Sequence, residues 1–122
     1  MIRKAHSEVR AVFVESNVDF HDPTKLAQEL SKTVASVLNK PESYVTVSIR
    51  KSMVMTRGGN PAKFAIVEVR SIGGLILKVN NQLCNDISKI LLEHGLDPAM
   101  IDLNFMDITP EDWGKSTGTF GK

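Results

Sequence analysis

The sequence predicts an α/β (α+β) fold in which two β-α-β repeats form a four-stranded sheet with two helices on one face. Four segments have the composition or alternation of strands, and two segments carry the apolar stripe of a helix. The order strand–helix–strand occurs twice, because residues 10–14 and 45–49 correspond to residues 66–70 and 101–105. Crossovers of this length suit parallel, right-handed pairing within each repeat.

The first repeat has clear boundaries. Residues 9–14 are mostly β-branched and aromatic, which is typical of a strand. Asp22 can cap a helix, and Pro23 suits its first position because the missing amide hydrogen would have no partner there. The apolar stripe ends before Asn39, which suits a left-handed C-cap. Residues 44–50 then alternate as a strand with one buried face.

The second repeat follows a glycine-rich turn at residues 57–61. Residues 64–72 predict a third strand, and residues 81–94 predict a helix that a glycine ends. Residues 101–106 alternate as the fourth strand. The segment from Thr109 onward suggests a C-terminal arm that docks on the body.

Composition predicts one domain, residues 9–122, with residues 1–8 as an N-terminal extension. The net charge of +1 and the lack of a long apolar segment argue against nucleic-acid and membrane partners. A single cysteine, Cys84, excludes an intrachain disulfide, and the three histidines share no ligand spacing, so neither metal nor cofactor is expected. The basic N-terminus lacks the apolar segment of a signal peptide. We expect a cytoplasmic protein, with release without a signal peptide as an open alternative.

The extension has three open arrangements, since it can fold over a pocket, pair with a sheet edge or extend freely.

The sequence leaves open how the sheet face without helices is covered. Its expected residues are polar: Thr46, Ser48, Arg50, Asp102 and Asn104. Parallel strands are usually covered on both faces. Either this face is exposed to solvent in a monomer, or the protein forms an oligomer in which several sheets surround a common axis and cover it.

Five segments carry a family resemblance. They are residues 39–45 (Asn-Lys-Pro-Glu-Ser-Tyr-Val), 55–59 (Met-Thr-Arg-Gly-Gly), 71–74 (Ser-Ile-Gly-Gly), 103–105 (Leu-Asn-Phe) and 119–120 (Thr-Phe). They resemble Gly-Lys-Pro-x-x-Tyr, Met-x-Phe-Gly-Gly, Ser-Ile-Gly, Ile-Asn-Tyr and Ser-Thr-Phe of the macrophage migration inhibitory factor family, in the tautomerase superfamily. Together, in this order, they are specific. The resemblance implies a homotrimer whose sheets form a barrel with the helices outside.

The family's activity also follows from the resemblance. Its general base is an N-terminal proline amine, whose basicity an apolar pocket and a nearby cation tune toward neutral pH. The amine moves a proton in keto–enol pairs such as those of phenylpyruvate, and dopachrome is a related substrate. By position, the implied pocket comprises the substrate-binding Lys40, Ile72 and Asn104, the last from a neighbouring subunit, and the rim residues Tyr44, Asp102, Trp113 and Phe120.

Structural roles are open alternatives for four of these residues. Lys40 can complement a helix dipole, and Ile72 can belong to the core. Asn104 can make an interface hydrogen bond, and Trp113 can serve in packing.

Three departures from the family pattern bear on function. Arg10 stands at the proline position inside the chain, where an amide nitrogen is not a base. Asp102 replaces a pocket tyrosine and would repel an anionic substrate. Residues 64–67 lack the Cys-x-x-Cys linked to thiol-oxidoreductase activity. We expect weak or no tautomerase activity and a cytokine-like binding role with a protein receptor. The alternative is an active keto–enol tautomerase of small aromatic 2-oxo acids that uses another base.

Overall fold

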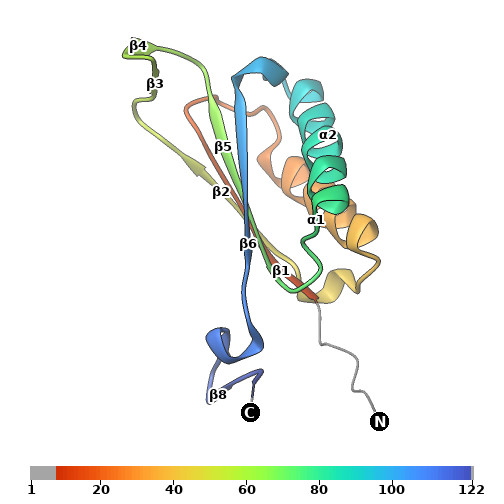
Figure 1. Ribbon diagram of the computed structural model, residues 1–122. Helices are drawn as coiled ribbons and strands as arrows, with labels where there is room; N and C mark the ends of the chain where they lie inside the picture. Colours follow the sequence, from red (N-terminus) through yellow and green to blue (C-terminus); the bar gives the residue numbers. More distant parts are fainter. Residues whose placement is uncertain (1–7, 122) are drawn as a thin grey trace.

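A computed structural model describes residues 8–121, and its four-stranded sheet has helices on one face only (Figure 1). The strands lie in the order β2 (Thr46–Lys51), β1 (Glu8–Ser16), β5 (Ala65–Ile72) and β6 (Ile101–Asp107). Pairing is parallel between β1 and β2 and between β5 and β6. The central pair, β1 and β5, is antiparallel and joins the two β-α-β units. The predicted fold class is confirmed.

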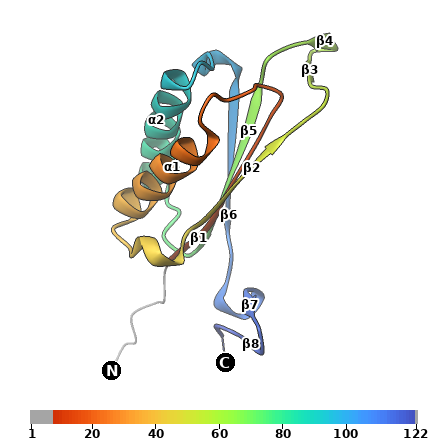
Figure 2. The ribbon, with the colours of Figure 1, turned by 180° about the vertical axis from the view of Figure 1, so that it is seen from behind.

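The helices α1 (Pro23–Leu38) and α2 (Leu77–Glu93) cover the same sheet face, as the reverse view shows (Figure 2). The predicted caps of α1 are confirmed. Asp22 Oδ1 accepts a hydrogen bond of 3.0 Å from Lys25 N, and Asn39 is left-handed with φ 54°. The prediction that α2 starts at residue 81 was wrong, because the helix begins at Leu77. Its N-cap is Ile76, which has no capping side chain, so the usual sequence signal is missing.

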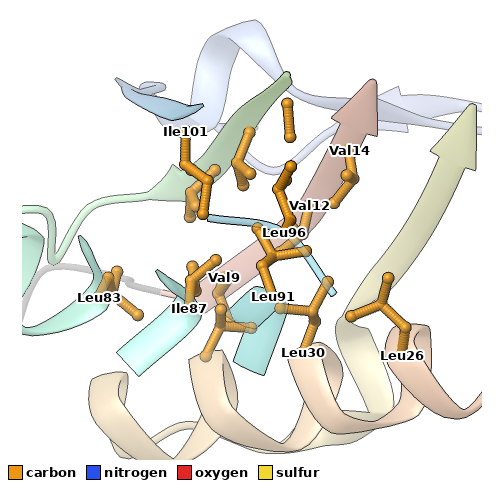
Figure 3. Close-up of a cluster of buried hydrophobic side chains, with 14 of the residues drawn as sticks. Val9, Val12, Val14, Leu26, Leu30, Leu83, Ile87, Leu91, Leu96 and Ile101 are labelled. Atoms are coloured by element: carbon orange, nitrogen blue, oxygen red, sulfur yellow. The ribbon is translucent and has the colours of Figure 1, made fainter. Parts of the chain in front are cut away.

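The core lies between the helices and the sheet (Figure 3). Side chains from α1 and α2 interleave and pack on the central strands. Those with no exposed surface include Leu26, Leu30, Val34, Leu83, Ile87, Leu91, Val12, Val67 and Val69. Full burial of one such aliphatic side chain contributes about 1.5–3 kcal/mol. The core therefore holds both repeats in one unit.

Short elements lie at the two ends of the sheet. The turn expected at residues 57–61 is a small hairpin of β3 (Thr56–Arg57) and β4 (Asn60–Pro61). The opposite end carries the C-terminal arm, residues 108–121, with the hairpin of β7 (Gly114–Lys115) and β8 (Gly118–Thr119) (Figure 1). The arm therefore lies at the end of the sheet where β1 begins.

Further short helices complete the chain. They are the 3-10 helices η1 (Glu42–Tyr44), η2 (Pro98–Met100) and η3 (Pro110–Asp112). Because η1 takes up Tyr44, β2 begins at Thr46, two residues later than expected. Glu8, expected to belong to the extension, is instead the first residue of β1. The alternatives for residues 1–7 concern a part of the chain outside the described residues.

The helix-free sheet face carries charged and aromatic side chains. The Phe13 ring lies 5.3 Å from Arg50 Cζ and 4.8 Å from Arg70 Cζ. Arg70 also donates hydrogen bonds of 2.7 and 3.1 Å to one carboxylate oxygen of Glu68. In the part of the chain that the structure describes, no helix is long and apolar enough to cross a membrane.

Candidate functional site

Arg10 lies at an irregularity in the pairing of β1 with β5. Val9 pairs with Ser71 and Ala11 pairs with Arg70, so Arg10 is an extra residue between two regular pairs. Such a bulge redirects a side chain out of the regular strand alternation and is frequent beside functional sites. The Arg10 side chain is only 10% exposed. The position that the resemblance assigns to a proline is therefore occupied here by an enclosed, internal arginine.

Three aromatic rings surround the Arg10 guanidinium. Its Cζ lies 5.5 Å from the ring centroid of Tyr44, 5.7 Å from Trp113 and 4.8 Å from Phe120. A cation within about 6 Å of a ring centroid is attracted by the ring's quadrupole. Tyr44 comes from η1, whereas Trp113 and Phe120 come from the C-terminal arm. Three of the expected rim residues thus meet, and they meet around Arg10.

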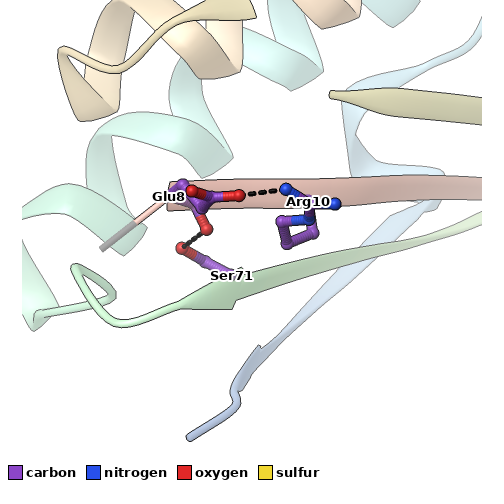
Figure 4. Close-up of polar contacts among 3 residues, drawn as sticks. All are labelled: Glu8, Arg10 and Ser71. Atoms are coloured by element: carbon purple, nitrogen blue, oxygen red, sulfur yellow. Dashed lines mark hydrogen bonds and ion pairs between the residues drawn. The ribbon is translucent and has the colours of Figure 1, made fainter. Parts of the chain in front are cut away.

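Glu8 supplies the negative charge of this site (Figure 4). Its Oε1 forms an ion pair with Arg10 Nη1, and its side chain is 9% exposed. A largely enclosed ion pair is screened less by salt than a surface pair. Among the described residues, the site therefore combines the Arg10 cation, the Glu8 carboxylate and three aromatic rings.

Ser71 supports the site from β5. Its buried Oγ lies 3.1 Å from the carbonyl oxygen of Glu8 and 2.5 Å from that of Gly73. A hydroxyl has one hydrogen to donate, so Ser71 donates to one of these carbonyls at a time. The Ser71 carbonyl in turn accepts a hydrogen bond of 2.8 Å from Ile108 N, where the arm begins. Ser71 therefore connects β1, the turn after β5 and the arm.

The expected substrate-binding residues are not all brought together within one chain. Lys40 follows the α1 C-cap and is half-buried, and its backbone N donates to Ala35 O at 2.9 Å. Ile72 is fully buried at the end of β5, where it pairs with Glu8. Asn104 is exposed on β6 and pairs with Glu68. Their roles in substrate binding stay predictions.

Asp102 lies toward the opposite end of the sheet from Arg10. It is near the start of β6, and its Oδ2 accepts a hydrogen bond of 3.2 Å from Arg57 Nη1. Both side chains are more than half exposed. In a single chain, Asp102 therefore interacts with the arginine of the β3–β4 hairpin and does not join the other three rim residues.

Sequence reasoning missed two members of the site. Glu8 was placed in the extension, although the pattern Glu-x-Arg at residues 8–10 puts opposite charges two positions apart on one strand. Ser71 was noted only as part of a family motif. Its burial and hydrogen bonds depend on residues from other strands, which the local pattern does not reveal. Within residues 8–121, no group of three or more His, Cys, Asp or Glu side chains is arranged to hold a metal ion.

Known proteins share this fold and sequence pattern. The family model of macrophage migration inhibitory factor matches residues 11–121, beginning directly after Arg10. The chain is 32% identical over 95 residues to a macrophage migration inhibitory factor homolog of Brugia malayi, covering 77% of this chain and 83% of that protein. It is 32% identical over 95 residues to D-dopachrome decarboxylase of Xenopus tropicalis, covering 76% and 80%.

Solved structures of macrophage migration inhibitory factor homologues have the same fold as this chain. A macrophage migration inhibitory factor homologue from Prochlorococcus marinus aligns with a TM-score of 0.85 and 31% identity, over 91% of this chain and 99% of that one. The macrophage migration inhibitory factor of Toxoplasma gondii aligns with a TM-score of 0.85 and 27% identity, over 90% and 99%. The chain therefore belongs to the macrophage migration inhibitory factor family, within a fold shared with the tautomerase superfamily.

Proposed function

We propose that the protein is a homotrimer that acts by surface recognition and has weak or no tautomerase activity. The observation that carries this proposal is the position of Arg10, both of its backbone nitrogen and of its guanidinium. Its backbone nitrogen is part of a peptide bond within β1, and its guanidinium lies among Tyr44, Trp113 and Phe120. An amide nitrogen is not a base, and a guanidinium stays protonated in proteins. Neither group can accept a proton from a keto acid.

The same contacts leave little room for an aromatic substrate. In the family pattern, rings at these positions line the mouth of the pocket. Here each ring lies within 6 Å of the Arg10 guanidinium, whose side chain is only 10% exposed. A planar 2-oxo acid would have to displace that cation, and it would then meet the nearby carboxylate of Glu8. The carboxylate of such a substrate would be repelled.

The helix-free sheet face supports assembly. It carries Phe13 between Arg50 and Arg70, and partly exposed side chains of both charge signs. A trimeric barrel would cover this face and would bring Asn104 of one subunit toward a neighbour. A fused 4-OT protein described as a symmetric trimer has the same fold, with a TM-score of 0.79 at 20% identity. Sedimentation of the full chain at micromolar concentration tests the assembly, and a monomer would contradict it.

The enzymatic part of the proposal is tested on the intact chain. Enol-to-keto conversion of phenylpyruvate is followed by absorbance at pH 6–8, and D-dopachrome is assayed in parallel because a relative bears the name D-dopachrome decarboxylase. We expect rates equal to those of buffer. Clear turnover would refute the proposal. If Lys40→Ala abolished that turnover, the alternative of a tautomerase with another base would hold.

A gain-of-function variant shows whether the rest of the pocket is competent. Residues 1–9 are removed and Arg10 is replaced by proline, so that processing of the initiator methionine exposes a proline amine. A truncated chain that keeps Arg10 is the matched control. We expect phenylpyruvate turnover in the proline variant only. The recognition role is tested by partner pulldown, which should survive Lys40→Ala and Asn104→Ala if binding uses the outer surface.

A further inference from the structure

The most enclosed arginine contact in the described chain joins two distant segments. Arg10, at the start of β1, is held between η1 and the C-terminal arm. We propose that Tyr44, Trp113, Phe120 and Glu8 form a guanidinium-binding site whose resident ligand is Arg10 of the same chain. Occupancy of this site docks the C-terminal arm against the start of β1. The inference does not depend on the proposed function, because it concerns what fills the cluster and not what the protein catalyses.

The number of rings distinguishes this cluster from an ordinary surface contact. Arg10 has ring centroids at 4.8, 5.5 and 5.7 Å and a side chain that is 10% exposed. For comparison, Arg57 contacts the Phe64 ring at 4.8 Å, but its side chain is 54% exposed. Cation–π attraction is stronger when the cation is removed from water. The enclosed three-ring arrangement therefore has the properties of a binding site.

The chemistry of the cluster selects a planar cation. Aromatic faces attract positive charge and stack well on a guanidinium, which is more weakly hydrated than an ammonium group. Glu8 adds a carboxylate, which pairs with Arg10 Nη1. Arg10 Nε is buried without a hydrogen-bond partner within residues 8–121, so within that range the guanidinium is held by its ion pair and by the aromatic rings. This environment suits guanidinium and alkylguanidinium groups, and it disfavours anions.

Within the described residues, most hydrogen bonds of the arm are internal, so the contact with Arg10 is a separate link between the arm and β1. Trp113 N donates to Pro110 O at 3.4 Å, and Phe120 N donates to Trp113 O at 3.1 Å. The second bond extends the pairing of the β7–β8 hairpin to Trp113 and Phe120. The rings of these two residues both lie near the Arg10 guanidinium. Within the described residues, the backbone bond from the arm to the sheet is the one from Ile108 N to Ser71 O. Most other arm residues are exposed.

Removal of the Arg10 side chain should therefore empty the site and release the arm. Trp113 is the only tryptophan in the chain, so its fluorescence reports the arm directly. In full-length Arg10→Ala we expect a red-shifted emission and stronger quenching by acrylamide. Methylguanidinium should reverse both changes saturably in the millimolar range, as suits a ligand of few atoms. The intact protein should not respond, because its tethered arginine has a far higher effective concentration.

Three controls isolate the chemistry. Urea has the shape of guanidinium without the charge, and sodium chloride supplies equal ionic strength; neither should restore the emission. Arg57→Ala removes a one-ring contact at the opposite end of the sheet and should leave Trp113 emission unchanged. A saturable response to methylguanidinium in Arg10→Ala, absent with urea and in Arg57→Ala, establishes the site. Native Trp113 emission in Arg10→Ala, or equal effects of urea and methylguanidinium, would overturn it.

A second pair of variants covers the case in which Arg10→Ala does not fold. Arg10→Lys keeps the positive charge, and Arg10→Met keeps the length of the side chain without charge. A cation site requires that the lysine variant retain more of the native Trp113 emission and acrylamide protection than the methionine variant. The reverse order would show that Arg10 acts as apolar filling, and would refute the proposal.

Discussion

Replacement of Ser71 by alanine tests how the site is held together. Ser71 has no exposed surface, and its Oγ lies within hydrogen-bond distance of the carbonyls of Glu8 and Gly73. The substitution removes one oxygen atom and keeps the Cβ, so the volume change is small. The lost hydroxyl removes a donor from the buried carbonyl of Glu8 or from the partly buried carbonyl of Gly73 in the turn after β5.

The expected cost follows from these contacts. A hydrogen bond contributes about 0.5–1.5 kcal/mol net, and leaving a buried acceptor unsatisfied costs about 1–3 kcal/mol. We therefore expect Ser71→Ala to lower the free energy of unfolding by about 1–3 kcal/mol. For a domain of this size, a loss of 2 kcal/mol lowers the melting temperature by about 5–10 °C. Trp113 emission should also shift, because β5 anchors both Glu8 and Ile108.

Urea unfolding followed by circular dichroism measures the change at one fixed protein concentration, because assembly would make stability depend on concentration. Ser36→Ala is the control, since Ser36 is exposed on α1 and alanine favours helix. It should change stability by no more than about 0.5 kcal/mol. If Ser71→Ala were no less stable than Ser36→Ala, the role assigned to the Ser71 hydroxyl would be wrong.

Three further predictions concern the N-cap of α1, the hydrophobic core and the reactivity of Cys84. Asp22→Ala should cost about 1 kcal/mol because it removes the α1 cap, whereas Asp22→Asn should be nearly neutral; equal losses in thermal unfolding would contradict the cap. Leu30→Ala should cost about 2–5 kcal/mol since Leu30 has no exposed surface. Leu92→Ala, at a residue that is 54% exposed, should cost far less, and similar values would argue against the assigned core. Burial raises the pKa of the Cys84 thiol, so less thiolate is present at neutral pH. Iodoacetamide labelling followed by mass spectrometry should be slower than for a free cysteine peptide and should rise at higher pH, and faster labelling would refute this.

Much of the fold was predictable because its signals are local. Asp22 and Asn39 mark the ends of α1 through the hydrogen bonds of single turns, and alternation of apolar residues marks the strands. The start of α2 was not predictable in this way, because Ile76 offers no capping side chain. The resemblance correctly identified the family, and with it three aromatic residues that the structure brings together.

The contents of the site depended on contacts between distant segments. Tyr44 and Phe120 meet only because the arm returns to the start of β1, and no periodicity within either segment encodes that meeting. The bulge at Arg10 arises from a shift in the antiparallel pairing of β1 with β5, which depends on the registration of two whole strands. Likewise, Asp102 lies by Arg57 because a separate hairpin reaches β6.

The sequence by itself determined the elements, their order and the family, because hydrophobic periodicity and helix caps act within a few turns of the chain. It also determined that an arginine, and not a proline, stands at residue 10. Only the tertiary structure decided where that arginine points: toward three aromatic rings from two distant segments, beside the carboxylate of Glu8 on its own strand. The physical reason is that an enclosed cation needs partners on several sides, and only a folded chain can supply them together.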